Sequence, residues 1–314
     1  MTSDPETENT VESRQKITPN LWFDDQAVEA AEFYTSVFEN AEIKGTTQYP
    51  DAGQEITGRE AGSVMTVTFK VEGFMFIALN GGPEFSFNPS ISFFVSRETK
   101  EEIDELWARL ADGGEVLIQL DEHPFSDYYG WVQDRYGVTW QLILPSNEGD
   151  WRPDLVPSLM FTQDNVNKAE EAIDFYTSVF ADTELGHLER YPEDTGPAKK
   201  GALAFGDFKA EGVWLAVMDT GVEQDFAFNE AISLIVNCET QDEVDELWDA
   251  LSAVPEAEQC GWLKDKYGVS WQITPTMLNE LPDDDPEANA RMMEALLEMK
   301  KLDITELQTA YNGN

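Results

Sequence analysis

The sequence predicts an α+β protein with two tandem domains of one fold, each made of paired β-α-β-β-β modules, and a helical extension at the C-terminal end. Three observations lead to this prediction. Phrases of sequence recur between the two halves of the chain, apolar residues follow the periods of strands and helices, and the order of these segments repeats. The 314 residues also suffice for two domains with sizeable cores.

Three phrases recur between the halves and mark the two copies. The segments 33–38, 104–107 and 130–141 correspond to 175–180, 245–248 and 261–272. Copies of this length are tandem domains rather than the short repeats of a solenoid, and we place them at 16–146 and 153–276. The first copy carries an additional segment around 115–129 that the second copy lacks.

The segments outside the copies have compositions of their own. Residues 1–15 are polar and acidic without an apolar run, so we expect a disordered N-terminus and no secretory signal. The joint between the copies is the polar stretch 146–152. Asp285 and Pro286 are typical of a helix start, and an apolar stripe follows them. We therefore expect residues 277–314 to form a helical extension that docks on a domain or on a second subunit.

Within a copy the expected elements follow the order of the module. In the first copy the strands are expected at 17–23, 43–49, 64–71, 74–80, 91–96, 116–120, 131–133 and 138–144, with helices at 26–38 and after residue 99. Thr99 and Glu102 form a capping box at the second helix, and Thr240 with Glu243 repeats it. Gly137 supplies a positive φ in the turn between the last two strands.

The composition excludes several classes of function. The chain has 62 Asp and Glu against 20 Lys and Arg, which gives a net charge of −42. Such a charge excludes binding to nucleic acid or to an anionic membrane surface, because these need basic side chains. No apolar run is long enough for a transmembrane helix. The two cysteines, Cys238 and Cys260, do not make a disulfide framework, so we expect a reducing cytoplasm.

The acidic residues are spread along the whole chain, and 18 Phe with 9 Trp argue against disorder. Many acids with few lysines are typical of cytosolic proteins of salt-accumulating halophiles. The alternative, an acidic surface for a partner, would be expected to cluster its charge.

The recurring phrases are similar to those of a known family. Phe33-Tyr34-Thr35-Ser36-Val37-Phe38, Leu79-Asn80-Gly81-Gly82-Pro83 and the segment from Cys260 to Gln272 resemble the PhnB-like branch of the vicinal oxygen chelate (VOC) superfamily, which includes glyoxalases, bleomycin-resistance proteins and extradiol dioxygenases. That branch often carries the label 3-demethylubiquinone-9 3-methyltransferase domain. The resemblance covers about 17–145 and 155–276 and implies that paired modules form a cupped mixed sheet in each copy.

Strand alternation predicts which residues line the cups. An apolar face, such as Val138, Trp140 and Leu142 in the last strand, should lie under the helices, and the mixed face should line the concave side. The candidates are Asn20, Trp22, Ser92, Phe94 and Gln141 in the first copy and Ser158, Met160, Ser233, Ile235 and Gln272 in the second. An apolar pocket with few polar groups is typical of small-molecule sites. The alternative is a packed interior whose amides are hydrogen-bonded core residues.

The resemblance also implies where a metal would bind. Metal-bearing relatives place His, Gln or Glu ligands on the first, fifth and last strands. The corresponding residues are Asn20 or Ser158, Ser90 or Ala231, and Gln141 or Gln272. Neutral amides and hydroxyls are weak ligands for Zn²⁺, Ni²⁺ or Fe²⁺, so we expect no metal.

Other candidates for chemistry are weaker. His123 and His187 fall on no cup strand and are expected to be surface residues. Cys260 is a candidate reactive thiol without a neighbouring base, so an inert thiol is the favoured interpretation. Neither glycine pair, 81–82 or 113–114, forms the strand, glycine-rich loop and helix that bind a nucleotide or S-adenosylmethionine.

Three hypotheses of function follow. We favour a metal-independent protein that binds a small organic molecule in its cups, with no cofactor and no catalytic residue assigned. The alternatives are a VOC-type enzyme acting on a small molecule, with Gln141 or Gln272 and Cys260 as candidates, and a structural scaffold with filled cups. A homodimer is left open, and the two cups are expected to prefer different ligands because Ser158 and Met160 replace Asn20 and Trp22.

We expect salt to stabilise the protein. The net charge of −42 repels itself in a compact state, and added ions screen this repulsion, to a Debye length of about 3 Å at 1 M. The midpoint of thermal unfolding should therefore rise as KCl is increased from the millimolar to the molar range, which differential scanning calorimetry measures. A midpoint that does not change with KCl would contradict this prediction.

Overall fold

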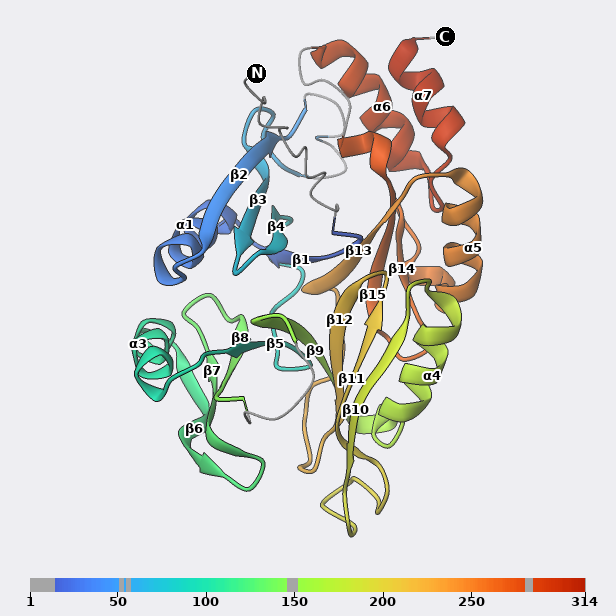
Figure 1. Cartoon of the computed structure of the whole chain (residues 1–314). Helices are drawn as coiled ribbons and strands as arrows, with labels where there is room; N and C mark the ends of the chain where they lie inside the picture. Colours follow the sequence, from blue (N-terminus) through green and yellow to red (C-terminus); the bar gives the residue numbers. More distant parts are fainter. Residues whose placement is uncertain (1–14, 51–53, 55–57, 146–151, 280–284, 314) are drawn as a thin grey trace, which may run out of the picture.

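The computed structural model describes residues 15–50, 54, 58–145, 152–279 and 285–313 (Figure 1). The first copy contains β1 (Ile17–Phe23), α1 (Ala27–Val37), β2 (Ala41–Gln48), β3 (Val64–Val71), β4 (Phe74–Asn80), β5 (Ile91–Ser96), α3 (Lys100–Leu110), β6 (Glu115–His123), β7 (Ser126–Gln133) and β8 (Thr139–Ile143). The second contains β9 (Leu155–Phe161), α4 (Ala169–Val179), β10 (Glu184–Arg190), β11 (Leu203–Ala210), β12 (Val213–Asp219), β13 (Ile232–Cys238), α5 (Gln241–Leu251), β14 (Trp262–Lys264) and β15 (Ser270–Pro275). Helices α6 (Pro286–Glu298) and α7 (Ile304–Asn312) form the extension.

This order of elements confirms the predicted fold class. The modules are β1–β4, β5–β8, β9–β12 and β13–β15, each with one helix after its first strand. The fourth module has only three strands, because it lacks the segment that forms β6 in the second. The expected capping box of Thr99 and Glu102 is present. At the second helix Thr240 accepts from the amide of Glu243 as expected, but the carboxylate of Glu243 accepts from the amide of Glu239 instead of that of Thr240. Among the described residues, no helix is long and apolar enough to cross a membrane.

Two seams between antiparallel strands join the copies. The seven-stranded sheet has the order β14-β15-β13-β1-β4-β3-β2, and the eight-stranded sheet has the order β10-β11-β12-β9-β5-β8-β7-β6. The first seam pairs β1 with β13, and the second pairs β5 with β9. Each sheet therefore contains one module from each copy, and Figure 1 shows the strands of both copies meeting along β1 and β13 and along β5 and β9.

The hydrophobic core, in contrast, lies inside a copy. In the first copy, Phe76 of β4 meets Phe93 of β5 with ring centroids 5.0 Å apart, and Tyr34 of α1 meets Trp140 of β8 at 5.4 Å. Tyr176 and Trp271 make the equivalent contact in the second copy at 5.5 Å. The apolar strand faces of the two modules of a copy thus pack toward each other, under their helices, as alternation predicts.

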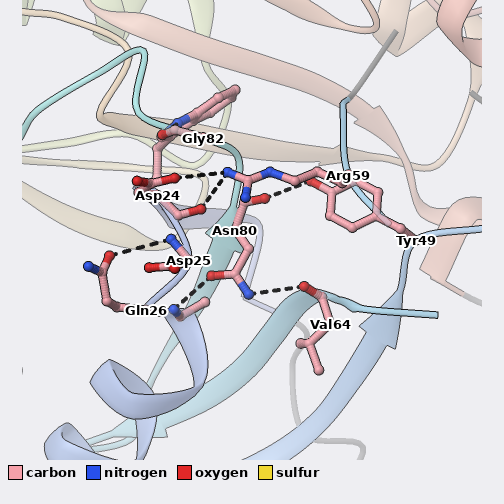
Figure 2. A network of polar contacts seen from close by, with 10 residues as sticks. Asp24, Asp25, Gln26, Tyr49, Arg59, Val64, Asn80 and Gly82 are labelled. Carbon is pink, nitrogen blue, oxygen red and sulfur yellow. Dashed lines mark hydrogen bonds and ion pairs between the residues drawn. The ribbon is translucent and has the colours of Figure 1, made fainter. Parts of the chain in front are cut away.

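Asn80, at the end of β4, fixes the start of α1 (Figure 2). Its side-chain oxygen accepts a hydrogen bond from the amide of Ala27 at 2.8 Å, and its nitrogen donates to the carbonyl of Val64 at 3.0 Å. The hydroxyl of Tyr49 donates to the carbonyl of Asn80 at 2.7 Å. Asp219 has the same role in the second copy, where it accepts from the amide of Ala169 at 3.2 Å. Asn80, of the phrase Leu79-Asn80-Gly81-Gly82-Pro83, is therefore a structural residue.

The C-terminal extension takes the place of the missing strand of the fourth module. The amides of Cys260 and Gly261 donate to the carbonyls of Met299 and Lys300 at 2.8 and 2.7 Å. Residues 299–302 therefore run beside β14 where β6 runs beside β7. The expectation that the extension docks on a domain of the same chain agrees with this contact.

Leu302 anchors this segment. It is buried against Met292 and Leu307 of the two terminal helices. A side chain at Gly261 would meet Leu302 at 3.1 Å, so the glycine makes room for the leucine. The side chain of Gln241, at the start of α5, donates to the carbonyl of Leu302 at 3.1 Å.

We expect Leu302→Ala to detach the extension from β14. The lost apolar contact should cost about 2–4 kcal/mol locally. Hydrogen exchange should then accelerate at the amides of Cys260 and Gly261, while the amides of β1 and β13 stay protected. Leu185→Ala serves as the control, because that leucine is 58% exposed on β10. Unchanged protection of both amides in the variant would contradict the proposed anchoring.

Candidate functional site

The ten predicted pocket residues lie on the sheet faces opposite the helices, but the structure groups them across the copies. We call this face of the seven-stranded sheet face A and that of the eight-stranded sheet face B. Face A contains Asn20, Trp22, Ser233, Ile235 and Gln272, and face B contains Ser92, Phe94, Gln141, Ser158 and Met160. The grouping by copy is therefore wrong. The modules of one copy turn their apolar faces toward each other, so their mixed faces point apart and cannot line one pocket.

Face B has a chain of hydrogen bonds at its centre. The hydroxyl of Tyr129 donates to Oε1 of Gln141 at 2.6 Å, and Nε2 of Gln141 donates to Oγ of Ser92 at 2.7 Å. All three residues are almost fully buried. Burial raises the pKa of Tyr129 far above its ordinary value, so its hydroxyl stays protonated. The amide of Gln141 is thus fixed from both sides.

Two further polar groups on face B have no hydrogen-bond partner in the described part of the chain. They are the indole nitrogen of Trp131 and the hydroxyl of Ser158, and both atoms are buried. Trp131 pairs with Gln141 in the sheet, and Ser158 pairs with Ser92. Around them lie Phe94 and Met160 and other apolar side chains. A buried donor without a partner is costly, and such groups are rare in native proteins.

Face A is filled by its own aromatic side chains. The rings of Trp22, on β1, and Trp262, on β14, meet with centroids 5.8 Å apart. Trp22 donates to the carbonyl of Gly82 at 2.8 Å, and a side chain at Gly81 would meet its ring at 2.2 Å. The glycine pair therefore makes room for this indole. Beneath the rings, Nε2 of Gln272 donates to Ser233 at 2.9 Å.

A hollow of about 950 Å³ opens on face B. Its apolar residues on face B are Phe94, Ile143, Val156, Phe205 and Ala216, and its lining continues over α1 and α3 with Val37, Leu106 and Arg109. Phe94 and Ile143 also contact the cluster that contains Trp131. Ser158 lies two residues along β9 from Val156, but the described residues that line the hollow include neither Ser158 nor Trp131.

The basic groups at the hollow already have partners. Arg97 forms an ion pair with Glu72. Arg152 donates to Asp207 at 2.7 Å, and its guanidinium lies 3.6 Å from the ring centroid of Trp214. Arg109, on α3, donates to a backbone carbonyl at 3.0 Å. Carboxylates therefore neutralise Arg97 and Arg152, whereas Arg109 is held by an uncharged carbonyl and keeps its positive charge.

Tyr129 and Trp131 were not predicted as residues of face B. The strand was expected at 131–133, whereas β7 begins at Ser126. Extending the alternation backwards from Gln133 would have placed Trp131 and Tyr129 on the same face.

The histidines and the cysteines lie outside the centres of both faces. His123 contacts Tyr129 from the end of β6, with ring centroids 5.4 Å apart, and His187 lies at the hollow on β10. Burial raises the pKa of Cys238 to about 12 and raises that of Cys260, so both thiols are weak nucleophiles. Among the described residues, no group of three His, Cys, Asp or Glu side chains could hold a metal.

A buried aspartate shapes the hairpin that presents Trp131 and Gln141. Asp134 accepts hydrogen bonds from the amides of Tyr136 and Val138 at 2.8 and 3.1 Å and from the indole of Trp140 at 2.8 Å. Asp265 repeats these bonds in the second copy. The recurring Asp, Gly and Trp of this phrase are therefore structural residues.

Comparisons with known proteins cover both copies. A family model described as 3-demethylubiquinone-9 3-methyltransferase matches residues 15–143 and again 153–274. The PhnB protein of Bacillus cereus is 40% identical over 42% of this chain and 100% of its own, with a TM-score of 0.38. A glyoxalase I mutant of Zea mays has 12% identity and a TM-score of 0.52, and the match covers 84% of this chain and 94% of that one. This second likeness shows the fold. No curated protein matches the chain.

The buried Asp134 should make stability depend on pH. Burial raises its pKa from 3.8 to about 6, so the folded state favours the protonated form. The protonated carboxyl of Asp134 therefore contributes its full stabilisation of the folded state below about pH 4, and this contribution is lost as the pH rises through 6. The free energy of unfolding relative to Asp134→Asn should fall by about 2 kcal/mol between pH 4 and pH 6, and by about 3 kcal/mol over the whole titration, measured by urea unfolding.

Asp127→Asn is the control for this measurement, because that residue is exposed on the same strand. The difference in the free energy of unfolding between the original chain and Asp127→Asn should not fall between pH 4 and pH 6. A constant or rising difference for Asp134→Asn would contradict the prediction.

Proposed function

Because the chain belongs to the 3-demethylubiquinone-9 3-methyltransferase family, the PhnB-like branch of the VOC superfamily, we propose that it binds a small organic molecule on face B without a metal ion. One observation carries the proposal. Beside face B lies a hollow of about 950 Å³ that combines an apolar wall, with Phe94, Val156 and Phe205, with polar side chains of the surrounding elements. This combination is typical of sites for small molecules.

The chemistry of the side chains supports metal independence. The residues at the expected ligand positions of face B offer two hydroxyls, from Ser90 and Ser158, and one amide, from Gln141. The amide oxygen of Gln141 already accepts a hydrogen bond from Tyr129. A divalent transition metal would need imidazole, thiolate or carboxylate here. This donor set does not fit such an ion.

The family description names a methyl transfer, and an enzyme of this or another VOC type is the second candidate. The glycine pair at residues 81–82 offers little support for it, because Trp22 occupies the space beside Gly81. Burial raises the pKa of Glu72, which lines the hollow, but its carboxylate is held in an ion pair with Arg97. Binding is therefore the function that the site supports better.

Neither face needs residues from a second copy of the chain, because both sheets are complete within one chain. A homodimer and a cytoplasmic location stay predictions from the sequence. The free state of Cys238 and Cys260 is compatible with a reducing compartment.

Filling the hollow should weaken binding. We expect the neutral dye Nile red to bind the full chain with a rise in fluorescence and to bind Ala216→Leu about tenfold more weakly, because the added atoms occupy the hollow. Phe205→Ala, which removes part of the wall, should also weaken binding. Dialysis against EDTA should change neither the affinity nor the melting temperature.

The control is Ile77→Phe, because Ile77 pairs with Asn20 on face A as Ala216 pairs with Ser158 on face B. This variant should bind the dye like the original chain. Equal binding by all variants, or loss of binding in EDTA, would contradict the proposal.

A further inference from the structure

A second hollow lies next to the hollow of the proposed function. Its volume is about 510 Å³, and its lining includes Lys209, Gly212 and Trp214. We call it the second hollow, and the hollow of about 950 Å³ the first hollow. Arg152 and Pro153 line both of them, so the two hollows meet at these residues.

Two strands show that the hollows follow one another along face B. On β11, Phe205 lines the first hollow and Lys209 lines the second. Asp207 lies between them on the same face, because alternate residues of a strand share a face. On β12, Ala216 lines the first hollow, and Trp214, two residues away, lines the second. The boundary between the hollows therefore lies at Asp207 and between Ala216 and Trp214.

Arg152 occupies this boundary. Its Nε donates to Oδ2 of Asp207 at 2.7 Å, and its Nη2 donates to Oδ1 at 3.2 Å. The guanidinium also lies over the ring of Trp214, 3.6 Å from the ring centroid. A Cβ at Gly186 of β10 would meet Oδ1 of Asp207 at 1.9 Å and Nη2 of Arg152 at 2.6 Å. The guanidinium of Arg152 thus lies against Asp207, Trp214 and the backbone of β10.

The ion pair of Arg152 and Asp207 resists displacement. The side chain of Asp207 is only 8% exposed, and it also accepts a hydrogen bond from the amide of His187 at 2.6 Å. Paired hydrogen bonds between an arginine and a carboxylate are strong and fix the orientation of both groups. A ligand that moved the guanidinium away would leave a buried carboxylate without its cation, which is costly. A molecule in the first hollow therefore meets Arg152 as a fixed wall.

On the premise that the proposed function is correct, we propose that Arg152 is the specificity-determining residue of face B. It closes the first hollow toward the second and so limits the length of the apolar part of the bound molecule. A longer molecule would have to pack on the ring of Trp214, and the guanidinium covers that ring.

A series of 1-alkanols from butanol to decanol measures the length that face B accepts. Each alkanol is used to displace Nile red from the full chain in molar KCl. Each added methylene should tighten binding about fourfold while it is buried in the first hollow. In the original protein this gain should stop at one length, because further methylenes meet Arg152 or stay in water.

Two double variants separate the wall from the ion pair. Both contain Asp207→Asn, so that no buried carboxylate loses its cation, and the asparagine oxygen can still accept from the amide of His187. With Arg152→Ala, the gain should continue for about two further methylenes, because the ring of Trp214 is uncovered, and decanol should bind about tenfold more tightly than to the original protein. With Arg152→Met, an apolar side chain again covers the ring, so the gain should stop within one methylene of the original length.

Arg190→Ala is the control for the loss of an arginine from the same sheet. Arg190 lies at the end of β10 and forms an ion pair with Glu170. It is not among the described residues that line either hollow. The gain in this variant should stop at the same length as in the original protein.

The outcomes separate this inference from the proposed function. If the two double variants accept the same length, Arg152 has only a structural role, and the inference is overturned while binding on face B stands. A gain that continues through decanol in the original protein would overturn the inference without any variant. If Nile red does not bind the original protein, the proposed function fails and the inference fails with it.

Discussion

The pairing of β1 with β13 and of β5 with β9 is the constraint on which the rest of the structure depends. Each seam is a short antiparallel ladder, and the faces of both sheets are assembled across these ladders. In the ladders, Asn20 lies opposite Ser233 and Ser92 lies opposite Ser158, so the polar centre of each face is at the seam. A shift of one residue in register would turn these side chains into the core. The polar residues therefore lie on the two faces only if the strands at the seams pair in this register.

The back-to-back packing of the modules explains why the seams are needed. The apolar faces of one copy cover each other, and this leaves the first strand of every module with an unpaired edge. An open edge of this kind can pair with any other strand. Here each edge is taken by the first strand of a module in the other copy. The outer strands of the two sheets are β2, β6, β10 and β14, and just before β14 the amides of Cys260 and Gly261 donate to the carbonyls of Met299 and Lys300.

Much of this could be predicted from the sequence, because alternation and capping are local. The helix expected at 26–38 is observed at Ala27–Val37. The partner of a strand is not a local property. Alternation places Ser92 on the mixed face of β5. It does not say whether the strand that pairs with β5 comes from the first or the second copy. The two copies carry the same phrases, so nothing in the pattern distinguished the pairings. Tyr129 was missed for a related reason, since β7 bends through irregular pairing with β6 and its start carries little periodicity.

Joining the copies in one chain has a consequence for how the two faces can change. Two identical subunits related by a twofold axis would build two identical seams, and one substitution would alter both at once. Within a single chain the twofold axis is only approximate. The two equivalent positions are encoded separately, so each can be substituted without the other. Tyr129 of one hairpin and Cys260 of the other, or Met160 and Trp22, illustrate such divergence. The covalent link thus frees one side of the molecule to acquire a new preference while the other keeps its role in holding the assembly together.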